Sequence, residues 1–426
     1  MATVVFFPEG AFGPTNNCVG IGDVLRCRGH RVVFVVEESF AGTLEAKGFE
    51  EASMRLGPPP EQEEEPGQFW KDFIRDTAPV FRRPTIEQLE GFIQPTWQAL
   101  VDGAKYVEPR LRELFEELEP DVVVEDNVVG FAALTAGGRP WVRIVSCNPA
   151  ELKDPLVPPT FSGYAAAGQD GWDEFRAEYE RVHRPLWEDF DAFMREQSAP
   201  PLPQLEFIRE SPWANLYLYP EEADYARARP LEGSWTRLDS CVRGTEEAWD
   251  EPDGFRADGQ KLVYLSLGSL GSADDDLMRK LVEELAASPH RFVVSKGPQH
   301  ELFELAENMT GAEFLPQASI LPRVDLVVTH GGNNTVTESF FFGKPMVVLP
   351  LFWDQYDNAQ RVHELGFGNR LDTYGHEPGE LLGAIDRLLA DEQLAERLRL
   401  MSARLQADPG TVRAADLIER IVAGER

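Results

Sequence analysis

A polar, glycine-containing turn between two apolar runs constrains the fold of this chain more than any other segment. The turn from Thr329 to Glu338 reads Thr-His-Gly-Gly-Asn-Asn-Thr-Val-Thr-Glu, and the flanking runs are Val324–Val328 and Met346–Leu349. Short continuous apolar runs bounded by turn residues are typical of buried parallel strands. The turn therefore lies where a strand ends and a helix begins, which is where open parallel sheets bind ligands. The free N–H groups at the start of such a helix suit a phosphate group.

The acidic composition argues against two classes of partner. The 426 residues carry a formal net charge of −32, whereas nucleic acids and anionic membranes bind basic surfaces. No apolar run is long enough to span a bilayer, and the first residues read as a core strand rather than a signal peptide. Four scattered cysteines without a Cys-x-x-Cys pair fit free thiols in a reducing compartment. We therefore expect a cytoplasmic protein that binds neither nucleic acid nor membrane.

Alternating apolar and helical stretches predict an α/β protein with two parallel-sheet domains, because the chain is too long for one ordinary core. The expected strands are Val4–Phe7, Arg31–Val36, Asp121–Glu125, Trp141–Val145, Leu262–Leu265 and Arg291–Ser295. The expected helices include Asn16–Arg28, Phe40–Gly48, most of Phe69–Leu118, residues 172–197 and Asp274–Ala287. Residues 57–66 are rich in proline and glutamate and predict an exposed loop. The expected division is an N-terminal Rossmann-like domain over 1–215, a linker and edge segment over 216–260, a C-terminal Rossmann-like domain over 261–405, and a terminal helix over 406–426 that packs back on the first domain.

An ordered set of motifs surrounds the turn. It consists of Phe314-Leu-Pro-Gln317, Ile320-Leu-Pro, Asp325–His330-Gly-Gly, Glu338, Gly343-Lys-Pro and Asp354-Gln355. In this order the set resembles the signature of the family 1 UDP-sugar glycosyltransferases. The N-terminal half resembles the family more loosely, in its Phe12-Gly13 turn and its Arg28–Phe34 run. The resemblance implies the GT-B fold, in which two Rossmann-like domains face each other across a cleft.

The resemblance also implies roles for the donor-side residues, each of which fits the chemistry of its side chain. Phosphate contacts are implied for Ser269, His330, Gly332, Asn333, Asn334 and Thr335; base and nucleoside contacts for Phe314, Leu315 and Gln317; ribose hydroxyls for Glu338; and sugar hydroxyls for Asp354 and Gln355. Taken alone, Phe314 could be a core residue and Glu338 an acid on a solvated helix face. The ordered combination favours the joint interpretation, because packing alone does not require it.

Neither a metal ion nor another cofactor is expected. The run Asp274-Asp-Asp276 is similar to a metal-binding Asp-x-Asp motif, but it follows a Gly-Ser turn and opens a helix, where acids act as caps. The helix dipole and His330 can stabilise a departing diphosphate without a metal.

The acceptor side lacks the residue that the resemblance would place there. The family's general base is a histidine directly after the glycine of the first strand–helix turn, and this chain has Pro14 at that position. The family's supporting carboxylate corresponds to Asp126, and the other acceptor-side candidates are Glu9, Gly13 and Asn16. Asp126 could act on the acceptor directly, Glu9 could replace the base, or the acceptor could be acidic enough to need little help. A non-catalytic sugar-nucleotide-binding protein and a nucleotide-sugar hydrolase or epimerase are the alternatives.

The predicted reaction is the inverting transfer of a sugar, most simply glucose from UDP-glucose, to a hydroxyl group of a small molecule. UDP and dTDP are both open, although a glutamate suited to a ribose diol favours UDP. Two segments, Gln68–Leu100 and Pro155–Trp187, carry aromatic side chains that suit a hydrophobic aromatic or polycyclic acceptor. These side chains are Phe69, Trp70, Phe73, Phe81, Phe92, Trp97, Phe161, Tyr164 and Trp172. A monomer or a weak homodimer is expected.

Overall fold

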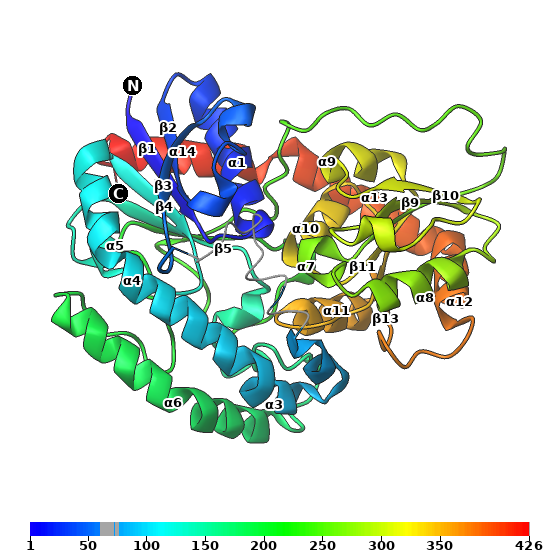
Figure 1. Ribbon diagram of the computed structural model, residues 1–426, viewed down its shortest axis with the longest axis horizontal. Coiled ribbons are helices and arrows are strands. Elements are labelled where there is room, and N and C mark those ends of the chain that lie inside the picture. Colours follow the sequence, from blue (N-terminus) through cyan, green and yellow to red (C-terminus); the bar gives the residue numbers. More distant parts are fainter. Residues whose placement is uncertain (60–71, 73–75, 426) are drawn as a thin grey trace.

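Two parallel β-sheets, each flanked by helices, make up the computed structural model, which describes residues 1–59, 72 and 76–425 (Figure 1). Most of the loop predicted at 57–66 and the side chains of Phe69, Trp70 and Phe73 lie outside the described residues. The fold class predicted from the sequence, with one parallel sheet in each half of the chain, is confirmed. None of the described helices is long and apolar enough to cross a lipid bilayer.

The N-terminal sheet has the strand order β3-β2-β1-β4-β5-β6-β7, and all of its strands are parallel. Its strands are β1 (Thr3–Pro8), β2 (Arg31–Glu37), β3 (Glu50–Met54), β4 (Val122–Asp126), β5 (Trp141–Val145), β6 (Ala214–Tyr217) and β7 (Trp235–Arg237). The inner strands β1, β4 and β5 are buried along almost their whole length because helices cover both faces of the sheet.

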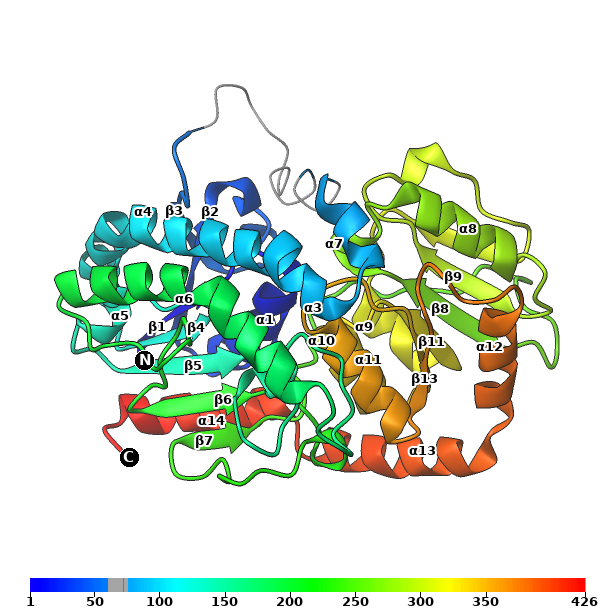
Figure 2. The same cartoon turned by 90° about the horizontal axis from the view of Figure 1, so that it is seen from below.

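Helices from both ends of the chain cover the N-terminal sheet. On one face, α1 (Phe12–Cys27) packs against α14 (Gly410–Val422), so the last helix of the chain lies on the first domain (Figure 1). On the other face, α4 (Gln94–Leu118) lies beside α6 (Trp172–Glu196), and Figure 2 shows the two helices side by side. The short elements here are η1 (Glu38–Phe40), η2 (Glu45–Lys47), η3 (Ala78–Arg82), α3 (Thr85–Gln88), η4 (Leu89–Ile93), α5 (Ala132–Thr135), η5 (Pro149–Glu151) and η6 (Glu221–Ala223).

The segment between β2 and the first long loop differs from its prediction. The helix expected over Phe40–Gly48 is wrong: the segment forms only two short 3-10 turns, η1 and η2. Gly42 between them adopts φ +84°, a left-handed conformation that interrupts a helix. The strand β3 was not expected, because Glu50-Glu-Ala-Ser-Met54 has no clear apolar alternation. It pairs only with β2, at the edge of the sheet, where one side of a strand remains open to solvent.

The C-terminal sheet has the order β10-β9-β8-β11-β12-β13 and is also entirely parallel. Its strands are β8 (Leu262–Ser266), β9 (Arg291–Ser295), β10 (Met309–Ala312), β11 (Leu326–Thr329), β12 (Met346–Val348) and β13 (Gly368–Arg370). Its helices are α7 (Gly268–Gly271), α8 (Asp275–Leu285), η7 (His300–Leu302), α9 (Gln317–Ile320), η8 (Leu321–Arg323), α10 (Asn333–Phe341), α11 (Gln355–Glu364), α12 (Glu380–Ala390) and α13 (Glu392–Ala407).

The N-terminal sheet extends beyond the boundary expected at residue 215. Strand β6 crosses that position, and β7 forms the edge of the same sheet inside the segment expected to be linker and edge structure. The chain then runs from β7 to β8 without a further strand among the described residues. This connecting segment contacts a residue of the C-terminal domain that was predicted to bind the donor.

Both sheets reverse their strand order between two neighbouring strands, β1 and β4 in one sheet and β8 and β11 in the other. Parallel open sheets bind ligands outside the carboxyl ends of the strands at such a switch point. Glu9 and Asp126 mark the first switch point, because Pro8 pairs with Asp126 in the register of β1 and β4. Ser269 and His330 follow the strands of the second, where Ser266 pairs with Thr329. The topology thus places the two predicted half-sites at equivalent positions of the two domains.

Candidate active site at the two switch points

The turn after β11 forms an open helix start. Helix α10 has Gly332 as its N-cap, and no side chain caps its first N–H groups. Gly331 has φ +92°, and a Cβ atom there would lie 2.8 Å from Val348 Cγ1 and 3.0 Å from the carbonyl oxygen of Gln355. Only glycine fits this conformation and this space. The uncapped N–H groups and the helix dipole make this turn a suitable seat for a phosphate group.

The imidazole of His330 lies between two glycines. A Cβ atom at Gly268 would approach its Cε1 to 2.7 Å, and one at Gly332 would approach its Nε2 to 2.6 Å. Burial lowers the pKa of His330 to about 4, so the ring is neutral at pH 7 and can donate one hydrogen bond. Ser269 lies half-buried in α7, directly after Gly268. Because neither glycine has a side chain, the imidazole of His330 fits between them, near Ser269 at the same switch point.

The carboxylate of Glu338 lies in a buried network of charged and polar groups. Its Oε2 accepts a hydrogen bond from Gln317 Nε2 at 2.7 Å, and Thr335 Oγ1 lies 3.3 Å from the other side-chain atom, Oε1, of Gln317. The Oε1 atom of Glu338 accepts a hydrogen bond from Arg243 Nη1 at 2.6 Å. Only 3% of the Glu338 side chain is exposed, and 4% of that of Arg243. Glu338 and Gln317, predicted as separate nucleoside contacts, are therefore bonded to each other.

Arg243 was not predicted from the sequence. It lies between β7 and β8, in the irregular segment expected to be a linker, and it also pairs with Glu246. A second contact fixes the same segment, because Ala318 N donates to Glu246 Oε2 at 2.7 Å. No local pattern around Arg243 signals this role, since the contact depends on how the segment crosses the C-terminal domain.

Phe314 lies three residues before Gln317, among the residues predicted to bind the donor, and 52% of its surface is exposed. The neighbouring Leu315 is half-buried and packs on the C-terminal core. The Phe314 ring contacts that of Phe12 from the N-terminal domain, with centroids 6.0 Å apart and planes inclined by 39°. Phe314 thus offers an open aromatic face beside the Gln317–Glu338 network.

Hydrogen bonds join the donor turn to the N-terminal domain. Asn334 Nδ2 donates to the carbonyl oxygen of Gly13 at 2.8 Å, and Asn333 Nδ2 donates to that of Leu218 at 3.1 Å. Gly13 lies in the first turn of α1, next to Pro14. The structure therefore brings the donor turn and the predicted acceptor-side loop into direct contact.

The two residues predicted to bind sugar hydroxyls are engaged within the protein, Asp354 across the domain junction and Gln355 inside its own domain. Asp354 Oδ2 accepts from the backbone N–H of Asn148 at 2.7 Å, and the carboxyl is buried. Gln355 Oε1 accepts from the N–H groups of Leu351 and Phe352 at 3.0 and 3.2 Å. One oxygen of each side chain is therefore already bonded within the protein, so a sugar contact would use the remaining atoms.

Asp126 and Glu9 lie together at the first switch point. Asp126 is 2% exposed at the end of β4, and its Oδ2 has no hydrogen-bond partner in the protein. Glu9 is half-buried, and its backbone N–H donates to the carbonyl oxygen of Asp126 at 2.9 Å. Helix α1 begins at Phe12, four residues earlier than predicted from Asn16, so Pro14 lies in its first turn, where proline is tolerated. Asn16 is half-buried on the next turn, and no described contact links it to Asp126.

Burial and mutual repulsion raise the pKa values of these carboxyl groups. Burial, followed by the nearby Glu151, raises the pKa of Glu9 to about 7. Burial also raises the pKa of Asp126 to about 8, and the charges of Glu9 and Glu151 add to this effect, while Ser146 and Asn17 oppose it. Glu151 itself follows β5 in the short turn η5. The sequence contained a signal for this residue, because it comes shortly after a predicted strand at the same edge of the sheet.

Four of the six described aromatic side chains that were predicted to suit an acceptor are packed at the domain junction. Phe81 and Phe92 contact Phe352, with centroids 5.0 and 5.3 Å apart. Trp97 and Phe161 contact Trp353, at 5.3 and 4.5 Å. Trp172 is buried and Tyr164 half-buried. The two variable segments therefore meet the C-terminal domain directly before Asp354.

Comparisons with known proteins agree with this geometry. Residues 245–411 match the sequence model of the UDP-glucoronosyl and UDP-glucosyl transferase family. An oleandomycin glycosyltransferase of Streptomyces antibioticus is 28% identical over 98% of this chain and 90% of its own length. A demethyllactenocin mycarosyltransferase of Streptomyces fradiae is 24% identical over 99% of this chain and 87% of its own length. Residues 245–411 thus carry the sequence pattern of this family, and the chain is similar to these glycosyltransferases over nearly its whole length.

A solved structure supports the fold of the glycosyltransferase over its whole length. The glycotransferase of kitacinnamycin superimposes with a TM-score of 0.70 at 25% identity, over 98% of each chain. The resemblance to family 1 and the GT-B fold, both predicted from the motifs, are confirmed.

The aspartate run that resembled a metal motif is engaged elsewhere in the glycosyltransferase. Asp274 caps α8, since its Oδ1 accepts from the N–H of Leu277 at 3.0 Å. Asp275 and Asp276 both pair with Arg279, at 2.8 and 3.3 Å. Within residues 1–59, 72 and 76–425, no group of three histidine, cysteine or acidic side chains is placed to hold a metal ion.

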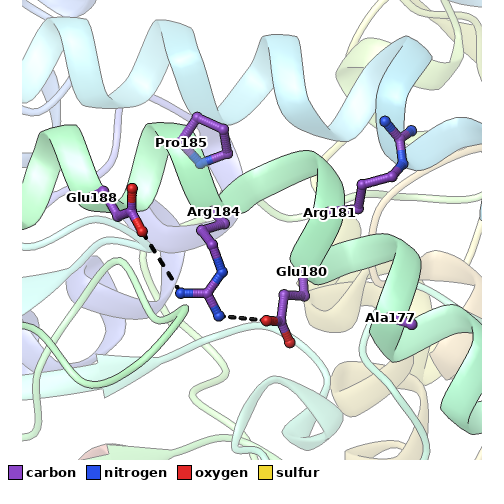
Figure 3. Close-up of a pocket in the computed structure, with 6 residues that line it drawn as sticks. All are labelled: Ala177, Glu180, Arg181, Arg184, Pro185 and Glu188. Atoms are coloured by element: carbon purple, nitrogen blue, oxygen red, sulfur yellow. Dashed lines mark hydrogen bonds and ion pairs between the residues drawn. The ribbon is translucent and has the colours of Figure 1, made fainter.

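A shallow hollow on α6 lies outside the two switch points (Figure 3). Its lining consists of Ala177, Glu180, Arg181, Arg184, Pro185 and Glu188. Arg184 pairs with Glu180 and, at 3.7 Å, with Glu188, while Arg181 pairs with Glu178 and Glu90. Since both arginines already pair with neighbouring glutamates, we assign no ligand to this hollow.

The buried carboxyl groups predict that the glycosyltransferase loses stability as pH rises from about 6.5 to 8. Burial raises the pKa to about 7 in Glu9 and Asp354, and to about 8 in Glu125, Asp126 and Asp357. A carboxyl whose folded pKa is raised binds more protons in the folded state between its unfolded and folded pKa values, so its stabilisation is lost as pH rises through the folded value. The buried His183 and His330, with pKa values lowered to about 4, have the opposite slope, but only below pH 6.5.

Thermal unfolding between pH 6.5 and 8 checks this prediction, and the midpoint should fall steadily. Asp126→Asn should make the fall shallower, since each such group contributes at most about 1.4 kcal/mol per pH unit. Asp173→Asn, at a fully exposed carboxyl, should leave the slope unchanged. A midpoint that stays level or rises over this interval would contradict the assignment.

Proposed function

We propose that this glycosyltransferase transfers a sugar, in the simplest case glucose, from a UDP-sugar to a hydroxyl group of a hydrophobic small molecule, with inversion. The observation that carries the proposal is the hydrogen bond between Asn334 and Gly13, because it joins a phosphate-binding helix start to the acceptor-side loop. Proximity of a donor and an acceptor in fixed geometry is a major source of catalysis.

The donor side would act as follows. The diphosphate would lie at the uncapped start of α10, with His330 and Ser269 as further hydrogen-bond donors. Phe314 would stack on the base, and Glu338 would accept from the ribose hydroxyls. Asp354 and Gln355 would contact sugar hydroxyls with the atoms that are not bonded within the protein. These donors would stabilise the charge that develops on the leaving diphosphate, so we propose that no metal is required.

The acceptor hydroxyl would attack the anomeric carbon while the bond from that carbon to the diphosphate oxygen breaks. We propose that Asp126 and Glu9 share the base role and take up the hydroxyl proton. Two interacting carboxyl groups titrate as a pair, and Glu9 is the more exposed of the two. Pro14 has no group that could take this proton.

The acceptor is proposed to be a natural product of substantial apolar surface. Two relatives that align with nearly the whole chain are named as an oleandomycin glycosyltransferase and a demethyllactenocin mycarosyltransferase. The aromatic residues at the domain junction are consistent with an apolar acceptor, since apolar and aromatic side chains predominate in small-molecule sites.

Incubation with UDP-glucose and a panel of phenols and alcohols tests the proposal. Glycoside and UDP should form in equal amounts, and the anomeric configuration of the product should be opposite to that of the donor. His330→Ala should lower turnover by about 10²–10³-fold, as expected for the loss of one donor to a developing anion. His363→Ala, at an exposed histidine of α11, is the matched control and should leave turnover unchanged.

Other outcomes would support the alternatives. Release of UDP without glycoside, across the whole panel, would indicate a hydrolase. Tight UDP-glucose binding with no turnover would indicate a non-catalytic binding protein, for which the proline at position 14 is the one sequence feature in favour.

A further inference from the structure

We propose that Phe12 and Phe314 clamp the nucleobase between them, with one ring supplied by each domain. This proposal rests on the proposed function, and it adds a residue of the N-terminal domain to the nucleotide site. The two phenylalanines are 48% and 52% exposed, and no other phenylalanine among the described residues is as exposed. Large aromatic side chains are normally buried, so two exposed rings in mutual contact across the domain boundary require an explanation.

The position of Phe12 follows the path of the nucleotide. Phe314 precedes Gln317, which bonds the proposed ribose contact Glu338. Phe12 precedes Gly13, whose carbonyl oxygen accepts from Asn334 in the phosphate-binding turn. A nucleotide with its diphosphate at α10 and its base on Phe314 would therefore pass beside the first residue of α1. Phe12 would then contact the base from the N-terminal domain.

The two rings are tilted against each other in this structure and would have to open to hold a base between them. A base stacked on both sides needs roughly 7 Å between the rings, as the sum of two carbon contacts of about 3.5 Å. The observed centroid distance is 6.0 Å with an inclination of 39°, so a small opening and rotation would admit a base. Phe12 is also supported from behind, because it makes an edge contact with the buried Phe40 at 5.5 Å. This contact holds the ring in place before the nucleotide arrives.

The clamp has a consequence for specificity. Stacking depends on the flat face of a base and tolerates different bases. The phenylalanine side chain has no hydrogen-bonding group, so the clamp contributes to affinity without reading the base edge. Uracil and thymine should therefore be held alike by the two rings, and the base should draw the two domains together.

Titration of UDP and of pyrophosphate into the full-length protein tests the clamp. Phe12→Ala should weaken UDP binding by roughly 5- to 150-fold, the range for loss of one stacking side chain. It should leave pyrophosphate binding unchanged, because pyrophosphate lacks a base; a merely structural defect would weaken both ligands. Phe12→Trp should retain UDP affinity. Tyr106→Ala, at an aromatic residue of similar exposure in α4, is the matched control and should change neither affinity.

The outcomes separate the clamp from the proposed function. If Phe314→Ala weakens UDP binding and Phe12→Ala does not, the clamp is wrong while the nucleotide site stands. If Phe12→Ala weakens UDP and pyrophosphate equally, Phe12 acts on the turn and not on the base, and the clamp is again wrong. If the wild-type protein binds neither UDP nor dTDP, the proposed function itself fails.

Discussion

Asparagine in place of Asp126 is expected to lower kcat for glycosyl transfer by about 10²–10⁴-fold, since a general base contributes a factor of this size. Asparagine has nearly the same shape but cannot accept a proton. UDP affinity should stay unchanged, because Asp126 belongs to the N-terminal switch point and the diphosphate to the other. Single-turnover kinetics together with UDP titration measure the two quantities separately.

The pH profile distinguishes a base from a residue that only supports the fold. Burial raises the pKa of Asp126 to about 8 and that of Glu9 to about 7, and a carboxyl group acts as a base only when ionised. The rate of the wild-type enzyme should therefore increase as pH rises through this interval, the reverse of the trend expected for its stability. In Asp126→Asn the upper part of this rise should disappear. In Glu9→Gln the rise should move to lower pH, because the charge of Glu9 contributes to the raised pKa of Asp126.

Asp102→Asn is the matched control for both variants, because this carboxyl lies exposed on α4. Pro14→His is a further probe of the same reaction. Position 14 lies three residues before Asn17, which is one of the side chains beside Asp126, and residues three apart share a helix face. A histidine there should accelerate transfer at pH 7. Near-wild-type turnover of Asp126→Asn with every acceptor would show that Asp126 is not the base and would favour an acceptor acidic enough to need none.

The positions that were predictable from the sequence are those whose role is encoded by local order. The strands around the donor turn are short apolar runs, and a polar turn at the end of such a run can face only one edge of the sheet. His330 and Ser269 therefore lie at a switch point, as the motif order implied. The position of Asp126 was predictable in the same way, because it ends the apolar run that forms β4.

The positions that were not predictable depend on contacts between distant segments. Arg243 lies in a stretch without periodicity, and its partner Glu338 is on α10, in the C-terminal domain. In the sequence Phe12 has no sign of a binding role, because its contact with Phe314 depends on how the two domains pack. The edge strand β3 lacks the apolar alternation of a half-buried strand, so tertiary pairing with β2 outweighs its weak local preference. Nor could the sequence show that Gln317 and Glu338 bond to each other, because both roles were assigned one residue at a time.

Replacing Arg243 by methionine is expected to destabilise the protein by about 3–5 kcal/mol, because breaking a buried ion pair leaves the other charge without compensation. Glu338 would remain 3% exposed with only Gln317 as a donor, and Glu246 would lose the same partner. Chemical denaturation of the ligand-free protein measures this change. Arg256→Met is the matched control, because Arg256 lies in the same connecting segment but is 30% exposed in its pairs with Glu251 and Asp325. It should cost no more than about 1 kcal/mol, as is usual for exposed pairs.

The double variant Arg243→Met with Glu338→Gln separates the structural role of the pair from its role toward the nucleotide. Removing both charges should restore the part of the stability that was lost at Glu338, because a buried ion pair replaced by neutral groups of similar volume is often as stable, whereas Glu246 still lacks Arg243 as its partner. The affinity for UDP should nevertheless stay low, since glutamine has one acceptor oxygen where the carboxylate offers two to the ribose hydroxyls. The affinity for dTDP, whose sugar lacks one of these hydroxyls, should fall less. Recovery of UDP affinity together with stability would instead show that Glu338 serves only to hold Arg243, and that the ribose is bound elsewhere.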